Sequence, residues 1–259
     1  MENLLSFEHV NYFYQTRKDE IFALSDVNFN VEEQSFASLV GPSGCGKTTI
    51  LSLTAGLLKP SSGEILLDGD KNIDIKKIGY MFQKDFLFEW RTVWKNITLG
   101  LEIQKPEDKD KKLALAEDLL KKYDLYGFIN QKPRSLSGGM RQRVALIRTL
   151  ALEPKLLLLD EPFSALDYQT RLSVCDDVYE IIKNEKKTAI LVTHDIAEAL
   201  SMSNKIIVLS SRPATVKENI ILNFEEKTPF LRRENKEFQG LFDHIWRQLS
   251  NDEKKGKTT

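Results

Sequence analysis

The chain has 259 residues, and its 37 basic and 38 acidic side chains leave a formal net charge of −1, without the basic surplus typical of nucleic-acid-binding proteins. Apolar residues make up 41% of the sequence, enough for a sizeable core, yet the longest apolar runs are far shorter than the roughly 18 residues that a transmembrane helix needs. Two cysteines, three scattered histidines and an amino terminus without a signal-peptide pattern favour a soluble intracellular protein with neither a disulfide framework nor a zinc site.

The first part of the chain contains strand-like segments. Residues 4–10 and 27–31 alternate in the manner of strands and are separated by a polar turn at 15–20, so we expect an antiparallel β portion here. A short strand over 35–40 runs directly into a glycine-rich segment, and a helix over 47–57 follows.

A helical region interrupts this pattern. Residues 64–68 and 78–83 are the next predicted strands, but from about 84 to 152 apolar residues recur at helical spacing. Strands return after Pro154, with helices between them, at 155–160, 189–193 and 205–209. This alternation predicts an α/β fold with a mostly parallel, covered sheet and a helical insertion.

We expect three parts along the chain. A main domain spans 1–225 and includes the helical subdomain, a helical appendage spans 226–250, and a disordered tail spans 251–259. The appendage carries an apolar stripe made of Phe238, Leu241, Phe242, Ile245, Trp246 and Leu249. We expect the stripe to pack on its own domain, and docking on a partner is the alternative.

The glycine-rich segment matches the phosphate-binding loop G-x-x-x-x-G-K-[ST] and lies between a strand and a helix, as the motif requires. Backbone amides of such a loop surround phosphate oxygens, Lys47 supplies a cation, and the hydroxyl of Thr48 suits Mg²⁺. The predicted binding residues are Gly41, Pro42, Ser43, Gly44, Cys45, Gly46, Lys47, Thr48 and Thr49. The loop therefore predicts binding of a nucleoside triphosphate with Mg²⁺.

Two carboxylates follow a run of four leucines at 156–159. Such a run predicts a buried strand, and Asp160 emerges at its carboxyl end, where open α/β sheets bind ligands. Asp160 can hold magnesium there, and Glu161 can orient or deprotonate an attacking water.

The segment Leu136-Ser137-Gly138-Gly139-Met140-Arg141-Gln142-Arg143 resembles the signature L-S-G-G-x-x-Q-R of the ATP-binding cassette (ABC) family. Other family motifs fall in register over about residues 4–215. Gln83 matches the glutamine loop, 164–167 matches the D-loop ending at Asp167, and His194 matches the switch histidine. Tyr14 stands where the family stacks an aromatic ring on adenine, and a core position in a hairpin is its alternative role.

The resemblance implies a P-loop NTPase core and an ATPase that works as a homodimer. Two copies pair head to tail, so each ATP lies between one phosphate loop and the partner's signature residues Ser137, Gly138 and Gly139, with Asp167 also at the nucleotide. Glu161 is implied to be the catalytic base, His194 stabilises the γ-phosphate, and Gln83 joins magnesium and water to the helical insertion. The implied magnesium ligands are Thr48, Gln83 and Asp160.

Two further segments resemble ATPases of nitrate, sulfonate, taurine and related importers. Residues 86–96 look like their L-x-P-W-R-T-V-x-x-N segment, with Glu89 in place of the proline, and 211–213 read Ser-Arg-Pro. The aromatic residues of 86–96 are either core of the helical insertion or a groove for a helix of a membrane subunit.

The expected function is that of an importer ATPase for a small solute of this kind or a related organic compound. Its implied partners are a second copy, multi-span membrane permease subunits and, indirectly, an extracytoplasmic solute-binding protein, which places the chain at the cytoplasmic face of the cell membrane. The alternative is a non-transport ABC ATPase that assembles or remodels a soluble complex.

Overall fold

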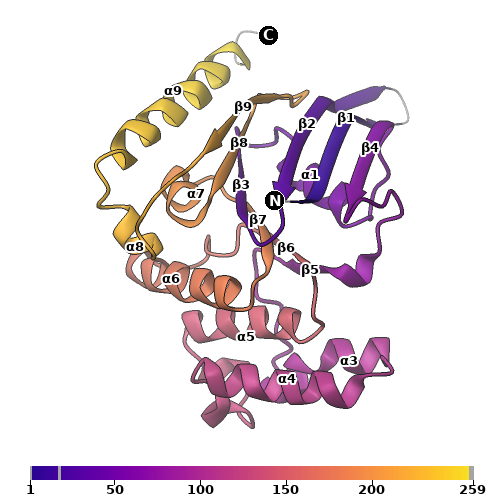
Figure 1. Cartoon of the computed structure of the whole chain (residues 1–259), viewed down its shortest axis with the longest axis vertical. Coiled ribbons are helices and arrows are strands. Elements are labelled where there is room, and N and C mark those ends of the chain that lie inside the picture. Colours follow the sequence, from indigo (N-terminus) through magenta and orange to yellow (C-terminus); the bar gives the residue numbers. More distant parts are fainter. Residues whose placement is uncertain (1, 17–18, 257–259) are drawn as a thin grey trace.

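The computed structural model describes residues 2–16 and 19–256, and the strands within this part form two sheets (Figure 1). A three-stranded antiparallel sheet, ordered β2-β1-β4, consists of β1 (Asn3–Gln15), β2 (Glu20–Glu32) and β4 (Ser62–Leu67). A six-stranded sheet, ordered β5-β6-β7-β3-β8-β9, consists of β3 (Phe36–Val40), β5 (Ile78–Met81), β6 (Leu156–Asp160), β7 (Thr188–Val192), β8 (Lys205–Leu209) and β9 (Val216–Ile221). All pairings in it are parallel except that of β8 with β9, so the predicted α/β fold is confirmed.

The helices fall into three groups along the chain. α1 (Lys47–Thr54) follows β3 directly, and the short η1 (Ile75–Lys77) precedes β5. Between β5 and β6 lie α2 (Val93–Ile97), α3 (Leu99–Gln104), α4 (Lys109–Lys122), η2 (Tyr126–Phe128), η3 (Pro133–Ser135) and α5 (Gly138–Leu150). The remaining helices are α6 (Tyr168–Asn184), α7 (Ile196–Met202), α8 (Pro229–Arg232) and α9 (Phe238–Gly256). In Figure 1, α3 and α4 form one end of the molecule and α9 lies at the opposite end.

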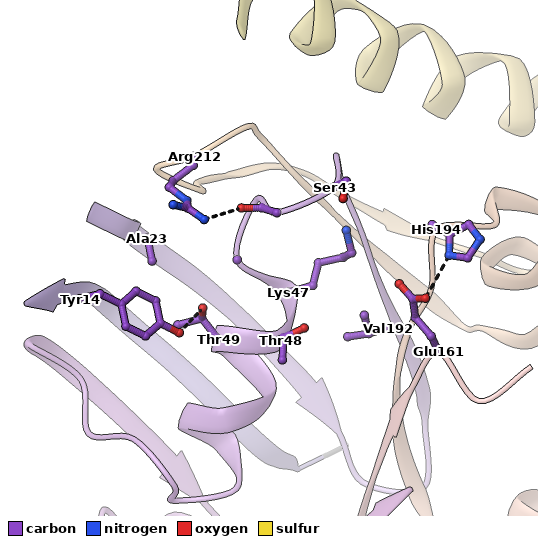
Figure 2. A pocket seen from close by; sticks show the side chains of 12 residues that line it. Tyr14, Ala23, Ser43, Lys47, Thr48, Thr49, Glu161, Val192, His194 and Arg212 are labelled. Atoms are coloured by element: carbon purple, nitrogen blue, oxygen red, sulfur yellow. Dashed lines mark hydrogen bonds and ion pairs between the residues drawn. The ribbon is translucent and has the colours of Figure 1, made fainter. Parts of the chain in front are cut away.

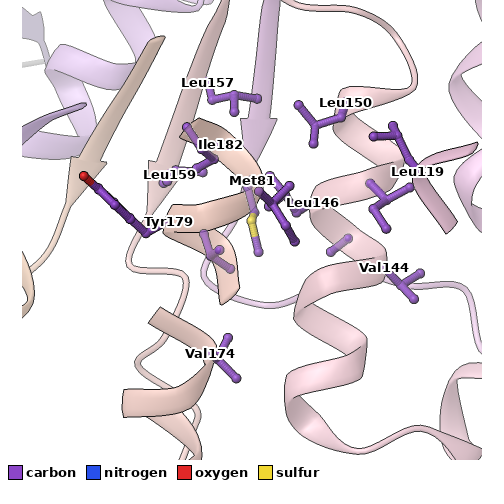
Figure 3. Packing of buried hydrophobic residues seen from close by; sticks show 14 of the residues in the cluster. Met81, Leu119, Val144, Leu146, Leu150, Leu157, Leu159, Val174, Tyr179 and Ile182 are labelled. Carbon is purple, nitrogen blue, oxygen red and sulfur yellow. The ribbon is translucent and has the colours of Figure 1, made fainter. Parts of the chain in front are cut away.

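The leucine strand β6 shows how the six-stranded sheet is covered on both faces. Leu157 and Leu159 pack with residues of α5 and α6 (Figure 3), whereas Leu156 and Leu158 pack with α1 and the three-stranded sheet. Successive side chains of a strand point to opposite faces, so an uninterrupted apolar run is required where both faces are buried.

The first hairpin is longer than predicted. β1 and β2 extend almost to the polar turn, because cross-strand pairs such as Tyr12 with Leu24 and Phe13 with Phe22 continue the ladder beyond the predicted ends. The register shifts between Phe7 and Val10, where His9 has a φ of 51°, so a bulge interrupts the alternation on which the sequence prediction relied. The helix after the phosphate loop is shorter than predicted and ends at Thr54, since Gly56 adopts a φ of 68°.

Two features of the carboxyl-terminal part differ from expectation. β9 was not predicted, because this edge strand has three polar residues in a row and no regular apolar alternation, with Ile220 its buried residue. α9 continues to Gly256, six residues past the expected boundary at 250, since residues 251–255 contain neither proline nor glycine. The last residues of the expected tail, 257–259, lie outside those described.

The apolar stripe of α9 packs on its own domain over most of its length. Phe238 and Ile245 are buried against α7 and β8, and Leu241, Phe242 and Leu249 pack partly on the same cluster. Trp246 points away from the cluster and is 58% exposed. None of the helices in the described part of the chain combines the length and apolar character needed to cross a bilayer.

Candidate functional site

A cavity of about 760 Å³ opens where β3 meets α1, at the carboxyl ends of the parallel strands (Figure 2). It is lined by Tyr14, Ala23, Ser43, Gly44, Gly46, Lys47, Thr48, Thr49, Glu161, Val192, His194 and Arg212. Parallel strands place the residues that follow them at one edge of the sheet, which is why segments more than a hundred residues apart meet here.

Lys47 is held inside the phosphate loop. Its Nζ donates to the carbonyl oxygens of Gly41 at 2.7 Å and Pro42 at 2.9 Å, and the residue is buried. Its ammonium group therefore lies at the centre of a loop whose amides begin α1, and no side chain caps that helix. Free amide groups and a cation at a helix start are the features that bind phosphate.

Glycine is needed in this loop for two separate reasons. Gly44 and Gly46 have φ values of 70° and 131°, which residues with a Cβ rarely adopt. In addition, a Cβ on Gly46 would lie 2.9 Å from Cδ2 of Leu24, because the loop packs directly on β2.

Tyr14 lies at the side of the cavity, not in the hairpin core. The residue is 38% exposed, and its hydroxyl group hydrogen-bonds with Oγ1 of Thr49 at 3.0 Å. The rings of Tyr14 and Tyr12 pack edge to face, with the centroids 4.9 Å apart. Tyr14 is thus an exposed residue that lines the cavity and not a core residue of the hairpin.

Three predicted residues meet beside the phosphate loop. Oε2 of Glu161 lies 3.2 Å from Nδ1 of His194, and Nε2 of Gln83 lies 3.5 Å from the same carboxylate oxygen and donates to Oγ of Ser164 at 3.1 Å. Glu161 has a φ of 47°, and its N–H donates to the carbonyl of Val192 on β7 at 2.8 Å. This unusual conformation turns the side chain out of the β6 strand direction toward the cavity.

Asp160 lies one residue earlier and deeper. The hydroxyl of Tyr80, on the neighbouring strand β5, donates to its Oδ2 at 3.0 Å. Burial raises the pKa of Asp160, and the nearby Glu161 adds to the rise while Lys47 opposes it. A partly buried carboxylate whose negative charge is not fully compensated stabilises a further cation beside it.

The residues expected to hold magnesium offer only oxygen donors. Thr48 provides a hydroxyl, Asp160 a carboxylate and Gln83 an amide oxygen, and the amide nitrogen of Gln83 is already engaged with Ser164. Mg²⁺ prefers oxygen ligands and keeps several waters, so a few such donors near a phosphate site fit this ion. Groups of three or more His, Cys, Asp or Glu side chains poised for a metal are absent from the described residues.

The signature residues lie elsewhere. Ser137, Gly138, Gly139 and Asp167 line a separate cavity of about 470 Å³ between the starts of α5 and α6. Ser137 caps α5 by accepting from the N–H of Met140, and Asp167 caps α6 by accepting from the N–H of Thr170. A single chain therefore does not bring these four residues to the phosphate loop.

Two residues at the site were missed by the sequence analysis. Arg212 lines the cavity and donates to the carbonyl of Gly44 at 3.2 Å. From the sequence, its Ser-Arg-Pro segment indicated only a resemblance to importer ATPases and no contact with the phosphate loop. Tyr80 contacts Asp160, and no sequence signal marks it, because the contact depends on β5 being the neighbour of β6.

Comparisons with known proteins agree with this geometry. The family model described as "ABC transporter" matches residues 24–164. The ABC transporter ATP-binding protein YtlC of Bacillus subtilis is 45% identical over 97% of this chain and 98% of its own length. The aliphatic sulfonates import ATP-binding protein SsuB of Bacillus cereus is 38% identical over 95% of each chain.

A solved structure matches as well. The dimeric post-hydrolysis state of the ATP-binding cassette MJ0796, bound to ADP and Pi, is 33% identical and covers 85% of this chain and 99% of its own, with a TM-score of 0.69. The phosphate loop, the carboxylates at the end of β6 and the signature segment are thus parts of one recognised architecture. The chain belongs to the ATP-binding cassette (ABC) transporter family and is an ATP-binding ATPase subunit of that family.

Proposed function

We propose that the chain energises an importer for a small organic solute of the sulfonate or taurine type, as a homodimer bound to membrane permease subunits at the cytoplasmic face of the membrane. The observation that carries the catalytic part is the meeting of Gln83, Glu161 and His194 beside the phosphate loop. The similarity to the aliphatic sulfonates import ATP-binding protein SsuB supports the solute class. An extracytoplasmic solute-binding protein would deliver the solute, which this subunit does not contact.

In the proposed reaction each side chain has a separate role around ATP. Tyr14 stacks on adenine, while Lys47 and the loop amides hold the outer phosphates. Glu161 accepts a proton from a water whose oxygen attacks the γ-phosphorus, and the bond to the bridging oxygen breaks to release ADP and phosphate. His194 donates a hydrogen bond to the γ-phosphate. Thr48, Asp160 and Gln83 would hold Mg²⁺, which neutralises phosphate charge when it is bound.

A second copy supplies what one chain lacks. Ser137, Gly138 and Gly139 lie outside the phosphate-loop cavity, so they would contact ATP only on a partner's loop. The dimeric state of the matched cassette supports this arrangement. The expected result is that a Glu161→Gln variant, which binds ATP without turnover, doubles its mass in light scattering when MgATP is added. A mass that stays monomeric at high protein and ATP concentrations contradicts the dimer.

The membrane partner is proposed to dock on an aromatic surface, defined as Phe82, Phe86, Phe88 and Trp90. These side chains are exposed, Trp90 to 72%, and their rings contact one another in pairs. The loop beneath them is rigid: Arg148 donates to the carbonyls of Asp85 and Phe86, and the buried side chain of Asn96 bonds to both backbone groups of Phe88.

The neighbouring residues of the same segment form core instead. Leu87 and Val93 are buried, and Trp94 packs partly on the main cluster. In this proposal the two alternatives from the sequence apply to different side chains of the segment. A held loop with exposed aromatic rings is typical of a preformed docking surface.

The docking proposal is tested with the tagged chain expressed beside its neighbouring membrane genes. A Phe86→Ala/Trp90→Ala variant should lose the co-purifying membrane protein while the isolated subunit keeps its ATPase activity. Trp246→Ala is the matched control, because Trp246 is an exposed tryptophan on α9, which lies at the opposite end of the molecule from α3 and α4. Unchanged co-purification of the double variant contradicts this surface, and a soluble complex in place of a membrane protein favours the non-transport alternative.

A further inference from the structure

The signature segment, which the proposed dimer assigns to the partner's ATP, is linked within one chain to the loop of His194, which it assigns to the chain's own ATP. The start of α5 carries the signature glycines, and it packs on the D-loop and the first turns of α6. A Cβ on Gly138 would lie 3.0 Å from Cδ2 of Leu166, and a Cβ on Gly139 would lie 2.8 Å from Cγ2 of Val174. The contact is tight enough that a displacement of the signature segment must also displace Leu166.

Arg171 lies in the first turn of α6 and connects Leu166 to the loop that carries His194, between β7 and α7. Its Nη2 donates to the carbonyl oxygen of Leu166 at 3.0 Å. Its Nη1 lies 3.6 Å from Oδ2 of Asp195 and 3.7 Å from Oε1 of Glu198. The guanidinium side chain is 23% exposed, so these contacts are only partly screened by water.

The two carboxylates hold the loop around His194 from both sides. Asp195 accepts from the N–H groups of Ala197 and Glu198 at the start of α7, and its own N–H donates to Oγ1 of Thr193. Oγ1 of Thr193 in turn donates to Oε2 of Glu198 at 2.7 Å. His194 lies between Thr193 and Asp195, so its backbone position follows from this network.

The charge of Arg171 matters because Glu198 is almost fully buried, with its side chain 4% exposed. Burial raises the pKa of Glu198, while Thr193 and Arg171 favour its charged form. The distances to both carboxylates exceed hydrogen-bond length, and Nε of Arg171 is buried without a hydrogen-bond partner among the described residues. The guanidinium therefore lies between two acceptors and is locked to neither.

We propose that Arg171 is a positioning residue that couples the signature segment, through Leu166, to the placement of His194. The inference rests on the proposed head-to-tail dimer, because it links the partner's ATP at Ser137–Gly139 to the ATP on this chain's own phosphate loop. A shift of the signature segment moves the carbonyl of Leu166, and the guanidinium of Arg171 moves with it. The distances from this guanidinium to the carboxylates of Asp195 and Glu198 then change. The loop that carries His194 then changes position at the γ-phosphate.

The kinetic test uses the full chain. If the two ATP sites are coupled, wild-type hydrolysis is cooperative, with a Hill coefficient for ATP above 1. Arg171→Gln should lower kcat by about 2- to 30-fold, the range of coupling energies for such networks, leave KM within about twofold and bring the Hill coefficient close to 1. Arg171→Lys keeps the charge but not the fork and should recover part of kcat. Since Arg171→Gln leaves Glu198 buried without its cation, the double variant Arg171→Gln/Glu198→Gln serves as the better-folded form and should show the same loss of cooperativity.

A matched control exists at the other ends of the same helices. Arg232 is buried and bridges α6 to α7 by bonding to the hydroxyl of Tyr179 and to the carbonyls of Ser201 and Ser203, far along both helices from His194. Arg232→Lys should lower the unfolding temperature without changing the Hill coefficient. If Arg171→Gln behaves in the same way as Arg232→Lys, Arg171 is only structural and the proposal is wrong.

A direct readout is available because the chain has only three histidines, His9, His194 and His244. In histidine-labelled protein, Leu166→Ala should shift the ring resonances of His194 and leave the other two in place. In an Arg171→Gln background the same substitution should no longer shift His194. An equal shift in both backgrounds overturns the coupling, even when the Glu161→Gln variant dimerises and the proposed function stands.

Discussion

The phosphate-loop cavity and the signature cavity are built by different means, although both are expected to contact ATP. The first lies at the ends of parallel strands, and backbone geometry sets most of it: the φ values of Gly44 and Gly46, the carbonyls that hold Lys47 and the N–H of Glu161 bonded to β7. The second lies between the starts of α5 and α6, where side-chain packing sets the geometry. One region is held by the sheet and the other by contacts between helices.

The two cavities should therefore tolerate substitutions differently. The phosphate-loop cavity, which the sheet holds, should keep its shape when a side chain is replaced, so substitutions there should alter chemistry or binding and leave stability almost unchanged. In the signature cavity, which contacts between helices hold, a substitution should change the packing and therefore the stability. The predictions below test this contrast, from the largest expected effect to the smallest.

Replacing Glu161 with glutamine should have the largest effect. Glutamine keeps the shape and one acceptor oxygen but cannot accept a proton, and general-base contributions are typically about 10²- to 10⁴-fold. The ATPase rate should fall by that factor, while nucleotide affinity and the unfolding temperature stay near those of the wild type. A rate within a few-fold of wild type would place the base elsewhere, and His194→Ala would be the next variant to measure.

Replacing Lys47 with alanine should act on binding. Hydrogen bonds to charged groups contribute about 1.5–3 kcal/mol, so the affinity for ATP measured by calorimetry should fall by roughly 10- to 150-fold. The fold should persist, because the strands around the loop do not depend on the ammonium group. Loss of folded protein in circular dichroism would show that Lys47, through its bonds to Gly41 and Pro42, is also a structural element.

Replacing Gly139 with alanine should test packing between helices. The new Cβ would lie 2.8 Å from Cγ2 of Val174, and overpacking costs about 1–3 kcal/mol, offset in part by the better helix propensity of alanine. The free energy of unfolding in urea should therefore fall by about 1 kcal/mol. In a Gly139→Ala/Val174→Ala variant the clash is gone, so the double-mutant cycle should give a favourable coupling. Additive effects would contradict the contact.

The smallest effect concerns the tie between the helical subdomain and α6. Glu185 accepts from Lys122 and Tyr123 at 2.7 Å each, and these bonds outweigh burial and hold the pKa of Glu185 below its ordinary value of 4.5. A lowered carboxyl pKa gives stability that is present above the unfolded-state pKa and is lost as the pH falls through the folded-state pKa.

Because Lys122 is half exposed, Glu185→Gln should lower the free energy of unfolding by only about 0.5 kcal/mol at pH 7, and by progressively less as the pH falls below 4.5. Urea titrations across that range measure the difference. Glu117→Gln is the control, since Glu117 pairs with Lys121 on the exposed face of α4 and should change the unfolding midpoint little. A pH-independent difference at Glu185 would contradict the role of its charge.

The sheet-held region was also the more predictable one. The phosphate-loop residues are contiguous in sequence. The run of four leucines predicts a buried strand, so the position of Asp160 and Glu161 at its end can be inferred before the fold is known. Arg212 and Tyr80 were out of reach, because their contacts depend on which strands and loops become neighbours in space.

The fold was predicted where the alternation of apolar residues was regular. The strands of the parallel sheet through β8 were placed within a few residues, whereas the bulge at His9 shortened the predicted hairpin and the polar edge strand β9 left no apolar pattern. The network at Arg171 had no sequence signal, since it joins the D-loop, the first turn of α6 and the start of α7, which are adjacent only after the sheet has formed.

The position of β3 has a consequence for how the protein is made. This strand carries the phosphate loop, and its two neighbours are β7 and β8, so Phe36 pairs with Ala189 and Ala37 with Lys205. During synthesis the hairpin β1–β2 can form early, but β3 waits until about residue 209 has left the ribosome, and its five residues, all buried in the folded protein, stay unprotected until then. Such long-range parallel pairing folds slowly and exposes aggregation-prone surface. The nascent chain is therefore a natural client for chaperones, and ATP binding is acquired only after β8 has been synthesised.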